Sequence, residues 1–136
     1  MKYPTGDLLD RASISLLKLI KTGEPQLLEE VGTYLLELSV RTKEHPELAK
    51  YFQDLFEINS EIWTYESDLR EGKLGNYKSS DQLKQASTSD LKSLAAVGLA
   101  AIKIRNANKK RKTKMNGIVE LVGDGWKDIK VNHASE

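Results

Sequence analysis

The chain has 136 residues, of which 39% are hydrophobic and 30% charged, and these proportions suffice for one domain with a single core. It contains no cysteine, which excludes disulfides, thiolate nucleophiles and cysteine-ligated zinc. The net charge is only +1, but residues 91–119 hold eight of the 21 basic residues and no acidic residue, which leaves 13 basic and 20 acidic residues elsewhere.

Hydrophobic periodicity and capping residues predict three helices in the first half of the chain. The first helix runs from about residue 6 to 21, with Thr5 as its N-cap and Gly23 as its stop. The second runs from about residue 25 to 42, and the third from about 46 to 71. Because the turns between them are very short, we expect neighbouring helices to be antiparallel, as in an all-α bundle.

The second half of the chain predicts a mobile loop at 72–87, a long helix at 88–122 and a short irregular tail at 125–136. The sequence therefore predicts one all-α domain over residues 1–136, a bundle of about four helices. At 1.5 Å per residue the last helix is roughly 50 Å long, which favours an overhang or a homo-oligomer. Its segment 94–102 is apolar on all sides, which predicts either the centre of a bundle or a homodimer seam.

Polar residues interrupt the apolar stripes of two helices. At 100° per residue, Asn59, Glu66 and Arg70 fall at the centre of the stripe of the third helix, and Asn108 and Arg111 fall within that of the fourth. Buried polar groups are costly unless they are paired, so these residues need partners. One interpretation is a network that only fixes packing, and the other is a polar pocket between the helices.

The pocket interpretation is the leading one and describes a non-catalytic protein that binds a phosphate-bearing small molecule such as a nucleotide. In this interpretation the arginines hold the anion, the asparagines orient it, the glutamate bonds a hydroxyl or amine, and a tryptophan stacks on a ring. The predicted ligand-binding residues are Asn59, Trp63, Glu66, Arg70, Asn108 and Arg111, with Asp10 and Lys18 of the first helix framing the site.

The same residues carry a resemblance. The first helix opens Gly6-Asp7-Leu8-Leu9-Asp10-Arg11-Ala12-Ser13-Ile14, the third reads Asn59-x-x-Ile62-Trp63-x-x-Glu66-x-x-Leu69-Arg70, and the fourth carries Asn108-x-Lys110-Arg111. These motifs resemble a family of short uncharacterised bacterial helical proteins, a domain of unknown function. That family has a Gly-Glu-x-x-Asp-Lys-x-Thr-Ile opening, an Asn-x-x-Leu-Trp-x-x-Glu-x-x-Ile-Arg middle and a late Asn-x-Arg-Arg helix. A phage-encoded member would fit the same motifs.

The resemblance covers about residues 6–119, with gaps. It implies that the predicted ligand-binding residues form one constellation, and it implies no activity. The family's lysine after the last motif would fall at Met115, with Lys114 one place early. The family's usual Glu-Lys-Ser-Tyr ending is absent from this chain.

Three alternatives stay open. The first is a self-associating interaction or structural protein whose polar network only fixes packing. The second is binding of nucleic acid or another polyanion, which is less favoured because no aromatic residues are interleaved for base stacking. That alternative rests on Lys103, Arg105, Lys109, Lys110, Lys112 and Lys114.

The third alternative is a carboxylate-metal phosphohydrolase. The pairs Asp54/Glu57 and Glu44/Glu47 have the required spacing, but they lie off the inner stripe of the third helix. No histidine pair has ligand spacing. We predict no catalytic residue, metal or cofactor, and an enzyme is not favoured.

The cellular location is predicted from two kinds of sequence segment, a signal peptide and a membrane-spanning run. The opening residues have no apolar segment of the signal-peptide kind, and no apolar run approaches the ~20 residues that span a bilayer. We therefore expect a cytoplasmic protein with no membrane partner.

Overall fold

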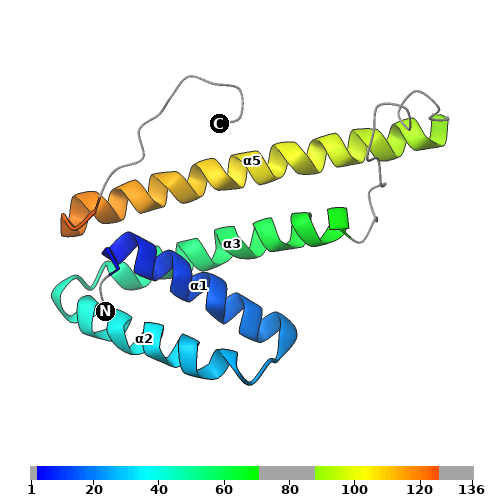
Figure 1. The fold of residues 1–136 in the computed structure, drawn as a ribbon. Helices are drawn as coiled ribbons and strands as arrows, with labels where there is room; N and C mark the ends of the chain where they lie inside the picture. The colour runs from blue at the N-terminus through cyan, green and yellow to red at the C-terminus, as the bar shows by residue number, and fades with distance from the viewer. Residues whose placement is uncertain (1–2, 71–87, 126–136) are drawn as a thin grey trace.

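The computed structural model describes residues 3–70 and 88–125, so the predicted loop at 72–87 and nearly all of the predicted tail lie outside the described residues. This part of the chain forms four helices: α1 (Thr5–Thr22), α2 (Leu27–Glu44), α3 (Leu48–Arg70) and α5 (Thr88–Val122) (Figure 1). No residue in the described ranges belongs to a strand. The predictions of an all-α bundle and of a long C-terminal helix are confirmed.

Glycines end two of the helices, as predicted. Gly23 has φ 66° and donates its N–H to the Leu19 carbonyl at 2.8 Å, and Gly123 has φ 80° at the end of α5. The predicted N-cap was wrong by one residue. Thr5 is the first residue of α1, and Pro4, in the N-cap position, makes no side-chain capping hydrogen bond.

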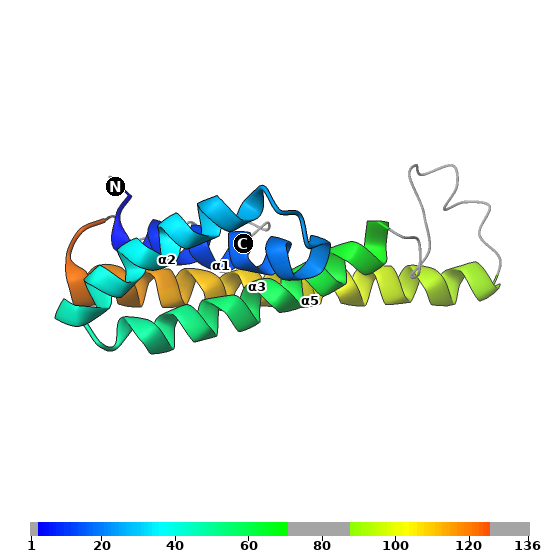
Figure 2. The same cartoon turned by 90° about the horizontal axis from the view of Figure 1, so that it is seen from below.

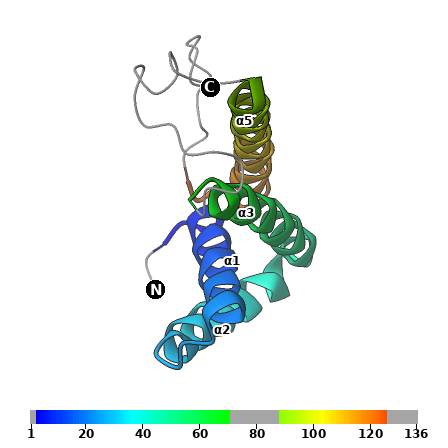
Figure 3. The same cartoon turned by 90° about the vertical axis from the view of Figure 1, so that its right-hand side faces the viewer.

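α1 and α3 each contact all three of the other helices. α1 and α2 form a hairpin, and α3 lies between that hairpin and α5 (Figure 3). α3 and α5 run antiparallel, since Asp54 pairs with Lys114 while Tyr65, further along α3, lies under Lys103. Figure 2 shows the α1–α2 hairpin covering only the part of α5 that lies toward its C-terminal end.

The core gathers where all four helices meet. One cluster of fully or nearly buried residues draws on every helix: Leu9, Leu38, Leu48, Leu55 and Ile118. Fully burying an aliphatic side chain contributes roughly 1.5–3 kcal/mol, so this cluster is a major source of the fold's stability. Met115, Leu121 and Val122 of α5 pack against it, which fixes the C-terminal half of that helix in the bundle.

The N-terminal half of α5 is covered much less. Of the two predictions for 94–102, the one that places it at the centre of a bundle was wrong: Leu99 is 53% and Ile102 55% exposed, and Ala101 is exposed too. Among the described side chains from Leu91 to Ala107, only Ala100 and Ala107 are buried, at 4% and 2% exposed. α5 extends past the end of α3 (Figure 1). In the described part of the chain, no helix is long and apolar enough to cross a membrane.

Candidate functional site

A polar network joins α1, α3 and α5. The Asn59 amide nitrogen donates to Asp10 Oδ1 at 3.0 Å and to Ser13 Oγ at 2.8 Å. The Ser13 hydroxyl donates in turn to the Asp10 carbonyl at 2.8 Å. From α5, Arg111 Nη1 lies 3.7 Å from Asp10 Oδ2. The structure therefore brings together three of the predicted site residues, Asp10, Asn59 and Arg111.

The network is buried at its centre and open at its edge. Asn59 is 5% exposed and Ser13 is fully buried, whereas the side chains of Asp10 and Arg111 are 18% and 34% exposed. Among the described residues, no buried side-chain nitrogen or oxygen lacks a hydrogen-bond partner. The inward placement predicted for Asn59 is confirmed, and its partners satisfy it without any added ligand.

Two predicted site residues lie apart from this network. Glu66 is exposed, so the prediction that it faces the core was wrong. It lies on the same side of α3 as Leu48, but α1 diverges from α3 toward its own C-terminal end and leaves that side uncovered (Figure 1). Lys18, near the end of α1, is also exposed to solvent.

Three predicted residues remain, Trp63, Arg70 and Asn108. Trp63 on α3 and Asn108 on α5 are both half-buried. The side chain of Arg70 lies outside the described residues. The constellation is therefore partly assembled, with a carboxylate, an amide and a guanidinium in contact and the predicted glutamate and lysine turned outward.

The basic residues of α5 are divided among several partners. Lys114 pairs with Asp54 at 3.1 Å, Arg111 pairs with Asp10, and Lys103 lies 5.6 Å from the centre of the Tyr65 ring. Exposed basic side chains follow further round the helix: Arg105, Lys109 and Lys110. Lys112 is half-buried. The arm is thus not a uniform cationic face, because several of its charges are used to attach α5 to α1 and α3.

Asp54 of α3 forms an ion pair with Lys114 of α5. Hydrogen bonding from Lys50 at 2.9 Å, and secondarily from Lys114, holds the pKa of its carboxyl below the ordinary value, although burial opposes the shift. Asp54 and Lys114 line a groove of about 340 Å³ together with Glu57, Ile58, Glu61, Lys110 and Thr113. A neighbouring groove of about 450 Å³ along α3 shares the two glutamates.

None of the eight predicted ligand-binding residues lines either of these grooves. The first groove has three carboxylates against two lysines, which does not favour an anionic ligand. Over residues 3–70 and 88–125, no three His, Asp or Glu side chains are close enough together to hold a metal ion.

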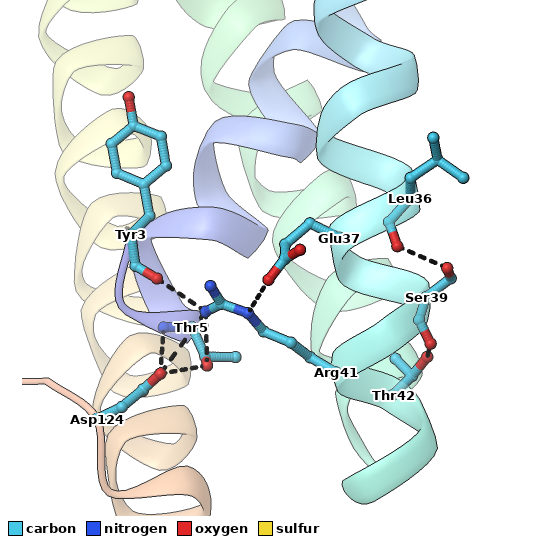
Figure 4. A network of polar contacts seen from close by, with 8 residues as sticks. All are labelled: Tyr3, Thr5, Leu36, Glu37, Ser39, Arg41, Thr42 and Asp124. Atoms are coloured by element: carbon cyan, nitrogen blue, oxygen red, sulfur yellow. Dashed lines mark hydrogen bonds and ion pairs between the residues drawn. The ribbon is translucent and has the colours of Figure 1, made fainter. Parts of the chain in front are cut away.

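A second polar cluster, which the sequence did not predict, ties the start of α1 to the end of α5 (Figure 4). Asp124 Oδ2 accepts from the Thr5 backbone N–H at 3.0 Å and from the Thr5 hydroxyl at 2.6 Å. Arg41 of α2 donates to the Tyr3 carbonyl at 2.8 Å and to Thr5 Oγ1 at 3.0 Å. Asp124 therefore supplies the N-terminal capping of α1 that Thr5 was expected to provide.

Arg41 completes this cluster, which we call the end clasp and define as Tyr3, Thr5, Glu37, Arg41 and Asp124. Its guanidinium pairs with Glu37 Oε1 at 3.1 Å and lies 3.6 Å from Asp124 Oδ2. The Arg41 side chain is only 17% exposed, which strengthens these contacts relative to surface ion pairs. No spacing in the sequence identifies Thr5 and Asp124 as neighbours, since 119 positions separate them.

Comparison with known proteins assigns no function to these residues. No family model, no curated protein and no solved structure matches the chain. The resemblance to the bacterial helical family therefore stays a prediction carried by the motifs.

Proposed function

We propose that the chain is a non-catalytic interaction protein that self-associates through the N-terminal half of α5. The observation that carries the proposal is the exposure of three large apolar residues there: Leu91 at 55%, Leu99 at 53% and Ile102 at 55%. Contiguous exposed apolar side chains on a folded domain are typical of a protein interface. Burying each of them in a partner would contribute on the order of 1.5–3 kcal/mol.

The composition of the segment supports a protein partner. Between residues 91 and 102 the only charged residue is Lys92, which is itself exposed. Depletion of charge at the centre with charge at the border is the usual composition of an interface. Basic residues begin directly after this segment, from Lys103 onward.

The polar network supports a packing role for the residues first predicted to bind a ligand. Asp10, Ser13 and Asn59 satisfy one another, and Arg111 attaches α5 to the same group. A satisfied buried network rigidifies a bundle and specifies how its helices align. In this proposal the network holds α5 in place so that its exposed segment is presented to the partner.

Sedimentation velocity of the purified chain over a range of concentrations tests the proposal. We expect a reversible dimer or higher oligomer, and we expect Ile102→Glu to weaken association by roughly 100-fold, equivalent to about 3 kcal/mol. The matched control is Leu36→Glu on α2, where an equally large apolar side chain is 71% exposed. A monomer at all concentrations, or equal loss in both variants, would contradict the proposal.

A phosphate-bearing small molecule is the second candidate, and the partial exposure of Arg111 favours it. The guanidinium is 34% exposed, and its ion pair with Asp10 is long at 3.7 Å, so an anion could compete for it. Native mass spectrometry tests this candidate. A stoichiometric ligand mass that Arg111→Met removes without unfolding the chain would support it, whereas a ligand-free oligomer would refute it.

A further inference from the structure

The outward strip of α5 has the spacing of a helix–helix seam. Leu91, Ala95, Gly98 and Ile102 are all exposed and follow one another at intervals of four, three and four residues. This is the heptad spacing by which two helices pack side by side. The same spacing continues into Arg105 and Lys109, which are also exposed, so the strip is apolar first and basic afterwards.

Gly98 lies beside open space within one copy of the chain. A glycine inside a helix costs about 1 kcal/mol relative to alanine, and a Cβ added at Gly98 would meet no atom within 4 Å. Two other helical glycines are different. A Cβ at Gly117 would lie 2.6 Å from the Tyr51 hydroxyl, and one at Gly6 would lie 3.4 Å from Met115. Together with Ala95 one turn earlier, Gly98 leaves a depression where a second helix can approach closely.

The order of side-chain sizes along the seam is the same in both directions. Two copies of the seam are therefore complementary when they pack antiparallel. Leu91, Ala95, Gly98 and Ile102 read large, small, small, large in both directions. Two antiparallel copies therefore align Ala95 with Gly98 at the centre and Leu91 with Ile102 on either side. Such a contact is isologous and closes as a dimer. The connection at 71–87 offers only Leu74, Tyr77 and Leu83 as large apolar residues, which favours a second copy over that segment as the occupant.

Charge selects the antiparallel direction. Two parallel copies in register would align Arg105 with Arg105 and Lys109 with Lys109 along the seam, and such like-charge pairs are destabilising. In the antiparallel register the two Arg105 residues are 17 residues apart along the axis, about 26 Å at 1.5 Å per residue. The two Lys109 residues are about 37 Å apart. Both separations exceed the Debye length of about 8 Å, so the repulsion is screened.

We infer that residues 91–102 of α5 pack antiparallel against the same residues of a second copy, with Ala95 opposite Gly98 and Leu91 opposite Ile102. This inference rests on the self-association proposed above and adds its direction and register. The two bundles then extend from opposite ends of the shared seam, and each basic stretch points away from the other.

Spin-label distances test the direction. The chain has no cysteine, so Lys109→Cys and Thr113→Cys, two exposed positions further along α5, can each be labelled singly. The antiparallel register predicts axial separations of about 37 Å and about 50 Å for the two labels. Short and equal distances at both positions would overturn the inference while leaving self-association intact. A monomeric mass with no dipolar coupling would overturn both.

Substitutions at two glycines test whether a second helix approaches closely at Gly98. We expect Gly98→Leu to weaken dimerisation by tenfold or more while helix content by circular dichroism is retained, because nothing within one copy occupies the space. The control is Gly32→Leu, at the other helical glycine with no atom near its Cβ, for which we expect unchanged affinity. Equal dimerisation of the Gly98→Leu variant and the unmodified chain would overturn the register.

Discussion

The two halves of α5 belong to one continuous helix but have opposite surroundings. The C-terminal half contributes Ile118 to the core and Arg111 and Lys114 to contacts with α1 and α3. Among the described residues of the N-terminal half, Ala100 is buried, whereas Leu91 and Ile102 are exposed. The difference indicates that the C-terminal half stabilises the single chain and that the N-terminal half is available for an interaction outside it.

The largest effect is expected at the network that anchors the C-terminal half. Replacing Asn59 by Ala removes two hydrogen bonds and leaves Ser13 and Asp10 without their donor, which should lower the free energy of unfolding by about 2–3 kcal/mol. Urea denaturation measures this loss. The control is Asn106→Ala, at an exposed position of α5. A change within about 0.5 kcal/mol is expected for this variant. Equal effects would mean that the network does not stabilise the bundle.

The glycine of the packed half should not tolerate a methyl group. Gly117→Ala puts a Cβ 2.6 Å from the Tyr51 hydroxyl, so the Tyr51 ring must move, at a cost of about 1–3 kcal/mol. Thermal unfolding of Gly117→Ala, Tyr51→Phe and the double variant measures the coupling between the two positions. We expect the double variant to recover part of the loss, because the phenylalanine lacks the closest atom. Strict additivity of the two losses would be inconsistent with this contact.

The end clasp should contribute less. Asp124→Ala removes the acceptor for both the backbone and the hydroxyl of Thr5, and it should lower the free energy of unfolding by about 1–2 kcal/mol, as for other lost helix caps. Asp124→Asn retains an acceptor oxygen but loses the attraction to Arg41, so its loss should be smaller. Chemical denaturation of the two variants in parallel would rank them, and the reverse order would argue against capping by Asp124.

The glycine of the exposed half should show the opposite sign to Gly117. Gly98→Ala meets no atom within 4 Å and raises helix propensity, so the single chain should gain up to about 1 kcal/mol. The measurement is unfolding at concentrations low enough to keep the chain monomeric. A destabilising effect would show that the N-terminal half is constrained within one copy, and the contrast between the halves would then fail.

The smallest effect is expected for the pH dependence of Asp54. Hydrogen bonding from Lys50 lowers the pKa of this carboxyl below the ordinary value of 3.8. Its contribution is therefore present above pH 3.8 and is lost as the pH falls through the lower pKa of the folded state. Asp54→Asn should remove this acid dependence and cost less than about 1 kcal/mol at pH 7. If the Asp54→Asn variant loses stability between pH 5 and 2 to the same extent as the unmodified chain, this role of Asp54 is contradicted.

Helical periodicity predicted the direction in which a side chain points from its helix better than it predicted whether another helix buries that side chain. Asn59 and Glu66 lie on the same stripe of α3, yet the first is 5% exposed and the second is exposed. The angle of a residue around its helix follows from the sequence, but the point at which α1 diverges depends on how three helices cross. The apolar segment of α5 shows the same limit, since its composition predicted burial without indicating whether the cover comes from the same chain.

The end clasp could not be predicted, because no local pattern pairs residues 119 positions apart. That separation also has a consequence for folding kinetics. Individual helices form within microseconds, whereas closing a loop that includes nearly the whole chain carries a larger entropy cost. Contacts that form after the rate-limiting barrier affect the unfolding rate rather than the folding rate. The Thr5–Asp124 contact should therefore determine how long a folded molecule lasts, and have little influence on how quickly it forms.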